Sequence, residues 1–217
     1  MRALHLVKTT SGASWALRQI RELIALGVEV GVVLPDDEGL AQEYRAAGAT
    51  VYFLVTDIAR LTNPASLWKA VRRFRAIVTE FEPTIVHSHF VGTTIFFRIA
   101  MTGMKPLRVF QVPGPLHLEN PLTRFAELAL SGERDRWRAT CDATRRIYLA
   151  SGVPGDRSSL TYYGRRMDEF RPGGMVNLRE IHSLPQSTSR AGMVAFLYPP
   201  KKWLGTERGL KGYGDLI

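Results

Sequence analysis

Short apolar runs alternate with amphipathic segments from the first residues onward, and this alternation constrains the fold more than any other feature. Apolar runs fall at residues 2–8, 28–34, 50–55, 84–90 and 107–114. Segments with apolar residues at helical spacing fall between them, at residues 15–27, 36–49, 63–83 and 93–103. Strand–helix units at this spacing predict an α/β fold: a Rossmann-like parallel sheet with helices on both faces. Asn63 is the expected cap of the long third helix, because Pro64 follows it.

Later segments predict a second, incomplete domain. Residues 120–152 are Arg-rich and are predicted to be helical, and 159–164 is a further expected strand. We expect a Rossmann-like domain over 1–180 and a linker over 181–190, where Pro, Ser, Thr and Gln break the periodicity. A new apolar strand, AGMVAFLY, then precedes a polar loop and the start of a helix, so 191–217 is expected to open a second Rossmann domain.

Composition limits the partners. The chain has 217 residues and one cysteine, Cys141, which excludes an internal disulfide framework and fits a cytoplasmic protein. No segment predicts a signal peptide or a membrane span. There are 29 Lys and Arg residues against 20 Asp and Glu, a net charge of +9, which favours an anionic partner. Without a zinc-ligand spacing, an RNA-binding aromatic strand or a basic region with heptads, nucleic acid is the least favoured such partner.

Ligands of parallel α/β sheets bind beyond the carboxyl ends of the strands. The first such loop, KTTSGAS, contains Ser11, Gly12 and Ala13 immediately before a helix, where free backbone N–H groups suit a phosphate or a sugar hydroxyl. A tight turn with no ligand is an equally good interpretation. Asp36 and Asp37 could mimic the ribose-binding acid of a nicotinamide enzyme, but the glycine fingerprint of such enzymes is missing.

Histidines follow two of the later strands. His87 and His89 end the fourth strand and share one face, with Ser88 opposite; either binds a ligand in the cleft, or one is a buried structural histidine. A zinc site is poorly supported, because the one cysteine is distant in sequence. His117 and Glu119 follow the fifth strand and are candidates for proton handling or substrate orientation.

A basic amphipathic helix is predicted within SLWKAVRRFRAIV. Its cations are Lys69, Arg72, Arg73 and Arg75. Packing of its apolar side into the core with a solvated basic face is the favoured interpretation, and the same basic rim could also contact anionic lipid.

The order of these segments resembles glycosyltransferase family 4, whose members are retaining enzymes built from two facing Rossmann domains, the GT-B fold. The resemblance rests on the Gly-bearing first loop, VHSH, VPGPLHLE, YYGRRMDEFRP and the later AGMVAFLY and RGLKGYGDLI. It departs from the family where Pro113-Gly114 replaces His-Gly, so that His117 is a substitute for the family histidine, and where Tyr163 replaces Asn before Gly164.

The resemblance implies transfer of a sugar from a nucleotide-diphosphate sugar to an acceptor hydroxyl with retention, in polysaccharide or glycolipid biosynthesis, with no cofactor and no required metal. The first domain would bind the acceptor, and the second the donor. The implied catalytic residues are His117 and Glu119. The implied substrate-binding residues are Ser11, Gly12, Ala13, His89, Gly114, Tyr163 and Gly164, and Lys211 would contact the donor diphosphate.

Further expectations follow from this resemblance. The chain would be the N-terminal part of its enzyme, inactive by itself, cytoplasmic and peripheral on the inner face of the plasma membrane. Its apolar segment 191–198 would be disordered, pack in a non-native way or pair with a second copy. The alternative function is a sugar- or phosphate-binding Rossmann module without chemistry, or an assembly fragment.

Overall fold

The computed structural model describes residues 1–61, 63–112, 116–118, 120–164, 167, 178–185 and 187. The chain divides into two compact units, Met1–Gly164 and Arg165–Ile217. In the second unit the described secondary structure is one short helix, α7 (Leu178–Ile181). The predicted domain boundary near residue 180 and the predicted linker lie in this second unit, and they stay predictions, as does the strand expected from residue 191, which lies outside the described residues.

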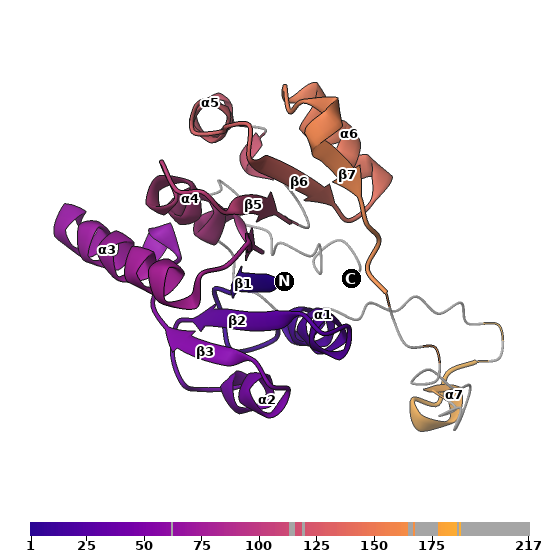
Figure 1. The fold of residues 1–217 in the computed structure, drawn as a ribbon. Coiled ribbons are helices and arrows are strands. Elements are labelled where there is room, and N and C mark those ends of the chain that lie inside the picture. The colour runs from indigo at the N-terminus through magenta and orange to yellow at the C-terminus, as the bar shows by residue number, and fades with distance from the viewer. Residues whose placement is uncertain are drawn as a thin grey trace. The chain divides into compact units, whose positions relative to one another are not determined.

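Seven parallel strands form one sheet in the first unit, in the order β3-β2-β1-β4-β5-β6-β7 (Figure 1). The strands are β1 (Arg2–Leu6), β2 (Glu29–Leu34), β3 (Thr50–Phe53), β4 (Ile85–Ser88), β5 (Leu107–Phe110), β6 (Asp135–Ala139) and β7 (Ser158–Leu160). The α-helices are α1 (Ser14–Ala25), α2 (Ala41–Ala46), α3 (Pro64–Phe81), α4 (Val91–Ala100), α5 (Pro121–Ala129) and α6 (Asp142–Ala150). Short 3₁₀ turns lie at η1 (Ile58–Arg60), η2 (Leu116–Leu118) and η3 (Gly155–Arg157).

Two hydrophobic cores cover the two faces of the sheet, because alternate strand residues point to opposite sides. On one face, Ala3, Val30 and Val32 pack with Ile20 of α1 and Tyr44 of α2. On the other face, α3, α4 and α6 pack against the larger core. Its strand residues are Leu4, Leu6, Val33, Val86, Phe110, Trp137 and Ala139, and its helix residues include Phe74, Phe96, Phe97 and Tyr148. The prediction of a Rossmann-like parallel sheet with helices on both faces is therefore confirmed.

Helix boundaries follow local chemistry. Asn63 caps α3 as expected, because its side-chain oxygen accepts a hydrogen bond from the Ser66 N–H at 2.8 Å. Helix α1 ends before Gly27, whose φ of 80° is in the left-handed region that favours glycine. Within the described residues, no helix is long and apolar enough to cross a bilayer.

The prediction that 120–152 is helical throughout is wrong. Strand β6 separates α5 from α6 and pairs in parallel with β5 and β7. Its inward side chains are Asp135, Trp137 and Ala139, all fully buried. The strand alternates as expected for β-structure, but its first inward residue is a carboxylate. Its burial is possible because the buried Arg98 forms an ion pair with it. Because the strand begins with a charged residue, its apolar alternation was not recognised in the sequence.

Candidate active site

The candidate site lies where β1 and β4 adjoin, at the point where the strand order reverses. β1 pairs with β2 on one side and with β4 on the other, and their connections leave in opposite directions. Ligands of open parallel sheets bind at this point, beyond the carboxyl ends of the strands. The loop after β1, the end of β4 and the loop after β5 all meet there.

The loop between β1 and α1 is held by hydrogen bonds to the loop that follows β2. The Thr10 hydroxyl donates to Asp36 Oδ1 at 2.8 Å, and the Leu40 N–H donates to the Thr10 carbonyl at 2.9 Å. A β-carbon at Gly39 would lie 2.4 Å from that carbonyl oxygen, so only glycine fits there. Asp37 pairs with Arg45 at 2.6 Å. Both aspartates of the predicted ribose-binding alternative are thus engaged within the protein.

The predicted ligand contacts of this loop lie at its surface. Ser11 and Gly12 are exposed, and Gly12 has a left-handed φ of 77°. Ala13 is buried at the N-cap of α1, where no side chain caps the helix among the described residues. The first backbone N–H groups of α1 therefore face a loop that carries no side-chain acceptor for them, which is the geometry that suits an anion or a hydroxyl.

Three histidines, His5, His87 and His89, meet beside this loop. His5 pairs in register with His87 across β1 and β4, and His5 Nδ1 lies 2.9 Å from His89 Nε2. One ring nitrogen from each lies within 4.8 Å of the others. His87 and His89 share a face as predicted, while Ser88 contacts Thr94 on the other face at 2.7 Å. Sequence reasoning missed His5, although its parity in β1 places it on the same face.

Burial sets the protonation of this cluster. It lowers the pKa of His5 to about 4 and holds the pKa values of His87 and His89 well below the usual value of a histidine. Three neutral imidazoles could hold a cation such as Zn²⁺. However, Arg138 adds a repulsive positive charge near His87. The expectation of no metal stays a prediction, and so does substrate binding by His89, which is fully buried.

Aromatic rings line the neighbouring surface. The Trp15 ring lies 5.1 Å from His89, 5.8 Å from Phe90 and 5.4 Å from Tyr163 between ring centroids. Tyr163 is 42% exposed, and partial burial raises the pKa of its hydroxyl to about 12. Gly164 is also exposed. The structure thus brings two predicted substrate-binding residues, Tyr163 and His89, into contact with Trp15.

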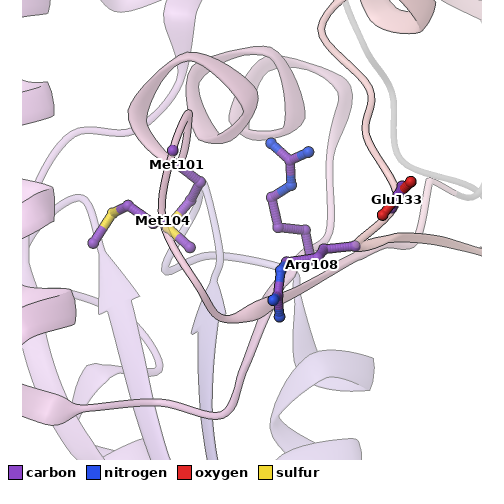
Figure 2. Close-up of a pocket in the computed structure, with 6 residues that line it drawn as sticks. Met101, Met104, Arg108 and Glu133 are labelled. Atoms are coloured by element: carbon purple, nitrogen blue, oxygen red, sulfur yellow. The ribbon is translucent and has the colours of Figure 1, made fainter.

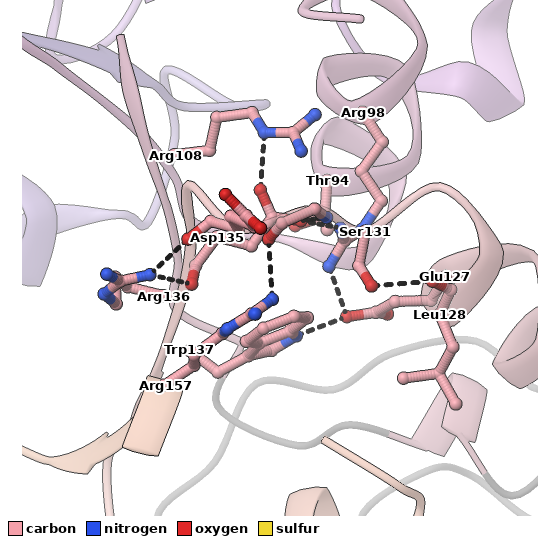
Figure 3. Close-up of polar contacts among 12 residues, drawn as sticks. Thr94, Arg98, Arg108, Glu127, Leu128, Ser131, Asp135, Arg136, Trp137 and Arg157 are labelled. Carbon is pink, nitrogen blue, oxygen red and sulfur yellow. Dashed lines mark hydrogen bonds and ion pairs between the residues drawn. The ribbon is translucent and has the colours of Figure 1, made fainter. Parts of the chain in front are cut away.

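His117 bonds to a carboxylate that sequence reasoning did not consider, that of Glu127. Its Nε2 bonds to Oε2 of Glu127, which is fully buried in α5. Glu127 also accepts from Arg98 Nη2 at 3.0 Å and from Trp137 Nε1 at 2.9 Å (Figure 3). Glu119 and Gly114 lie outside the described residues, as does Lys211. Sequence reasoning missed Glu127, which lies ten residues beyond His117 within α5.

A buried ion network supports this pair. Arg98 is fully buried and donates to Asp135 Oδ2 at 2.7 Å as well as to Glu127. Arg108 Nε lies 2.5 Å from the other oxygen of Asp135 (Figure 3). The guanidinium of Arg98 stacks 3.9 Å from the centroid of the Phe110 ring. The positive charges of two arginines therefore neutralise the negative charges of two carboxylates in this buried network.

One described pocket lies away from this site. It has a volume of about 260 Å³ and is lined by Met101, Gly103, Met104, Arg108, Glu133 and Arg134 (Figure 2). The two methionines and Gly103 follow α4, Arg108 is the second residue of β5, and Glu133 and Arg134 precede β6, so the pocket is at the amino edge of the sheet. The topological rule for parallel sheets favours the carboxyl edge, and we base the functional assignment on that edge.

Comparison with known proteins agrees with this architecture. Residues 12–164 match a model of the glycosyl transferase 4-like domain. No curated protein matches the chain at a significant level. Among solved structures, HepE (Alr3699) of Anabaena in complex with UDP-glucose has a TM-score of 0.60 at 14% identity, covering 84% of this chain and 50% of that one.

Two further structures share the fold. The lipopolysaccharide outer core galactosyltransferase WaaB has a TM-score of 0.55 at 13% identity, covering 75% of this chain and 45% of that one. The UDP-GlcNAc 2-epimerase of Neisseria meningitidis, bound to UDP-GlcNAc, has a TM-score of 0.56 at 17% identity, covering 74% and 46%. The chain spans about half the length of these proteins. The family model covers most of the chain, which therefore belongs to the glycosyl transferase 4-like family.

Proposed function

We propose that this chain is the acceptor-binding part of a retaining glycosyltransferase, which moves a sugar from a nucleotide-diphosphate sugar to an acceptor hydroxyl. The observation that carries the proposal is the family match over 12–164, which ends at the proposed substrate-binding residue Gly164 and includes every described residue of the predicted site except Ser11. The solved neighbours include complexes with UDP-glucose and with UDP-GlcNAc, which supports a nucleotide-sugar donor.

The described residues suit an acceptor sugar. The N–H groups at the start of α1 follow the exposed Ser11 and Gly12 and can donate to a hydroxyl or a phosphate. Trp15 and Tyr163 offer ring faces next to them. His117 lies at the neighbouring strand end and supplies a nitrogen that can accept a hydrogen bond from a hydroxyl. Donor binding would fall to residues outside this unit, Lys211 among them, and it needs no cofactor.

We further propose a lipid-linked acceptor and peripheral attachment to an anionic membrane. Helix α3 buries Phe74, Ile77 and Phe81 but leaves Trp68 64% exposed. Arg72 lies 5.6 Å from the centroid of the Trp68 ring, and Lys69 and Arg73 are exposed beside it. An exposed tryptophan within a basic rim is suited to the headgroup region of a bilayer. This arrangement supports a role in polysaccharide or glycolipid synthesis.

The test is transfer by the complete gene product. Radiolabelled nucleotide-diphosphate sugars are supplied one at a time with a lipid extract, and the anomeric configuration of the product is read by NMR. The proposal predicts transfer with the anomer of the donor retained, and loss of transfer in H117A. Inversion would refute the retaining mechanism. Absence of transfer with every donor, together with sugar binding, would favour the non-catalytic binding module.

A further inference from the structure

We propose that Glu127 is a positioning residue for His117: it fixes the imidazole as the Nε2–H tautomer and leaves Nδ1 as the nitrogen that meets a substrate hydroxyl. The role of Nδ1 toward substrate rests on the proposed function. The tautomer and its control by Glu127 rest on the hydrogen-bond geometry and on the ionised state of the Glu127 carboxyl.

Helix α5 holds His117 at two points. The Glu127 carboxylate bonds to the ring at Nε2, and the Thr123 hydroxyl donates to the His117 backbone carbonyl. The next residue, Leu118, is 1% exposed and packs into the larger core. Both the backbone and the ring of His117 are therefore oriented by a single rigid helix, although the histidine itself comes from the loop after β5.

The hydrogen-bond inventory of Glu127 determines the tautomer. Its Oε1 already accepts from Arg98 and from Trp137, and its Oε2 faces His117. Burial by itself would raise the pKa of Glu127, but the bond from His117 and the charge of Arg98 outweigh it and lower the pKa to about 2. An ionised carboxylate only accepts hydrogen bonds, so the proton must be on His117 Nε2.

The other ring nitrogen of His117 is free. Nδ1 is buried and has no hydrogen-bond partner among the described residues. In the neutral ring with a proton on Nε2, Nδ1 carries a lone pair, and a buried acceptor without a partner is costly. A hydroxyl that enters the site and donates to Nδ1 would satisfy it. The residue that acts on substrate is His117, and Glu127 acts through it.

The wild-type chain provides the first test. The chain is labelled with ¹⁵N-histidine, and long-range ¹H–¹⁵N spectra report the protonation of each ring nitrogen. H117Q identifies the signals of His117 by their loss. The proposal predicts a proton on His117 Nε2 and a lone pair on Nδ1. A ring with its proton on Nδ1, or a rapidly exchanging mixture of both tautomers, would overturn it, and this outcome needs no variant of Glu127.

E127Q gives the opposite arrangement. The Gln oxygen is still required by Arg98 and Trp137, so its NH₂ group would face His117 and donate to Nε2. The His117 proton should then move to Nδ1. E133Q is the matched control, because Glu133 is an exposed glutamate of the same region, and it should leave the spectrum of His117 unchanged. An unchanged tautomer in folded E127Q would refute the proposal.

Transfer by the complete gene product gives the functional readout. Because Glu127 acts through His117, E127Q and H117A should lower transfer to the same extent, and E127Q/H117A should be no worse than H117A. Additive losses would mean that Glu127 does not act through His117. If the protein shows no transfer at all, the proposed function fails, but the tautomer measurement still decides the role of Glu127.

Discussion

Acid should destabilise the first unit through the histidine cluster under the candidate site. His5 is 1% exposed, and burial lowers its pKa to about 4, against about 6.5 in an unfolded chain. As the pH falls below 6.5, His5 becomes protonated in the unfolded chain but stays neutral in the folded chain. Stability is therefore lost between pH 6.5 and 4. From pH 7 to pH 5, His5 alone should remove about 2 kcal/mol from the free energy of unfolding.

Urea unfolding at pH 7 and pH 5, followed by tryptophan fluorescence, measures this loss. His87 and His89 add to it in the same direction, because burial lowers both pKa values too. H5Q should remove about 2 kcal/mol of the difference between the two pH values, whatever its own stability. H182Q is the matched control, because His182 is an exposed histidine of the second unit. A pH difference that is the same in H5Q and wild type would refute the assignment of this acid sensitivity to the cluster.

Three further predictions concern other parts of the chain. G39A should lower the free energy of unfolding of the first unit by about 1–3 kcal/mol in urea, because Gly39 has a left-handed φ and an added β-carbon would clash with the Thr10 carbonyl. G103A is the control and should cost less, because Gly103 also has a left-handed φ but an added β-carbon there would meet no neighbouring atom. R98M should cost about 3–5 kcal/mol, because it leaves Glu127 and Asp135 buried without their shared cation; an effect below 1 kcal/mol would contradict the network. The chain should sediment with anionic vesicles but not with neutral ones, and W68S should weaken this binding; equal sedimentation with both vesicle types would contradict a membrane role for α3.

The sequence predicted the fold well where elements follow apolar periodicity. β1 and β2 consist mostly of buried apolar residues, and α3 has both an N-cap residue and an apolar stripe, so local signals specify each of them. β6 was missed because it begins with Asp135, whose burial depends on Arg98 in α4, 37 residues away. A partner that distant leaves no trace in the local pattern.

The candidate site shows the same division. Loop positions such as Gly12 could be proposed from the sequence because the rule about strand ends depends only on the order of elements. Glu127 was missed because the packing of α5, and not closeness in sequence, brings it to the His117 ring; the roles of His117 and Glu119 stay predictions. His5 was missed for a similar reason: its contacts with His87 and His89 depend on the pairing of β1 with β4, which the sequence does not state.

The most direct test of the central claim is where a sugar binds. Hydrogen exchange of the chain is measured by mass spectrometry with and without a panel of octyl glycosides and UDP-glucose. Binding at the carboxyl edge predicts slower exchange in residues 8–13, 89–90 and 116–118 with at least one glycoside. Residues 101–108 and 131–134, around the amino-edge pocket, serve as the internal control and should be unchanged. Protection confined to that pocket, or protection nowhere with any ligand, would contradict the account.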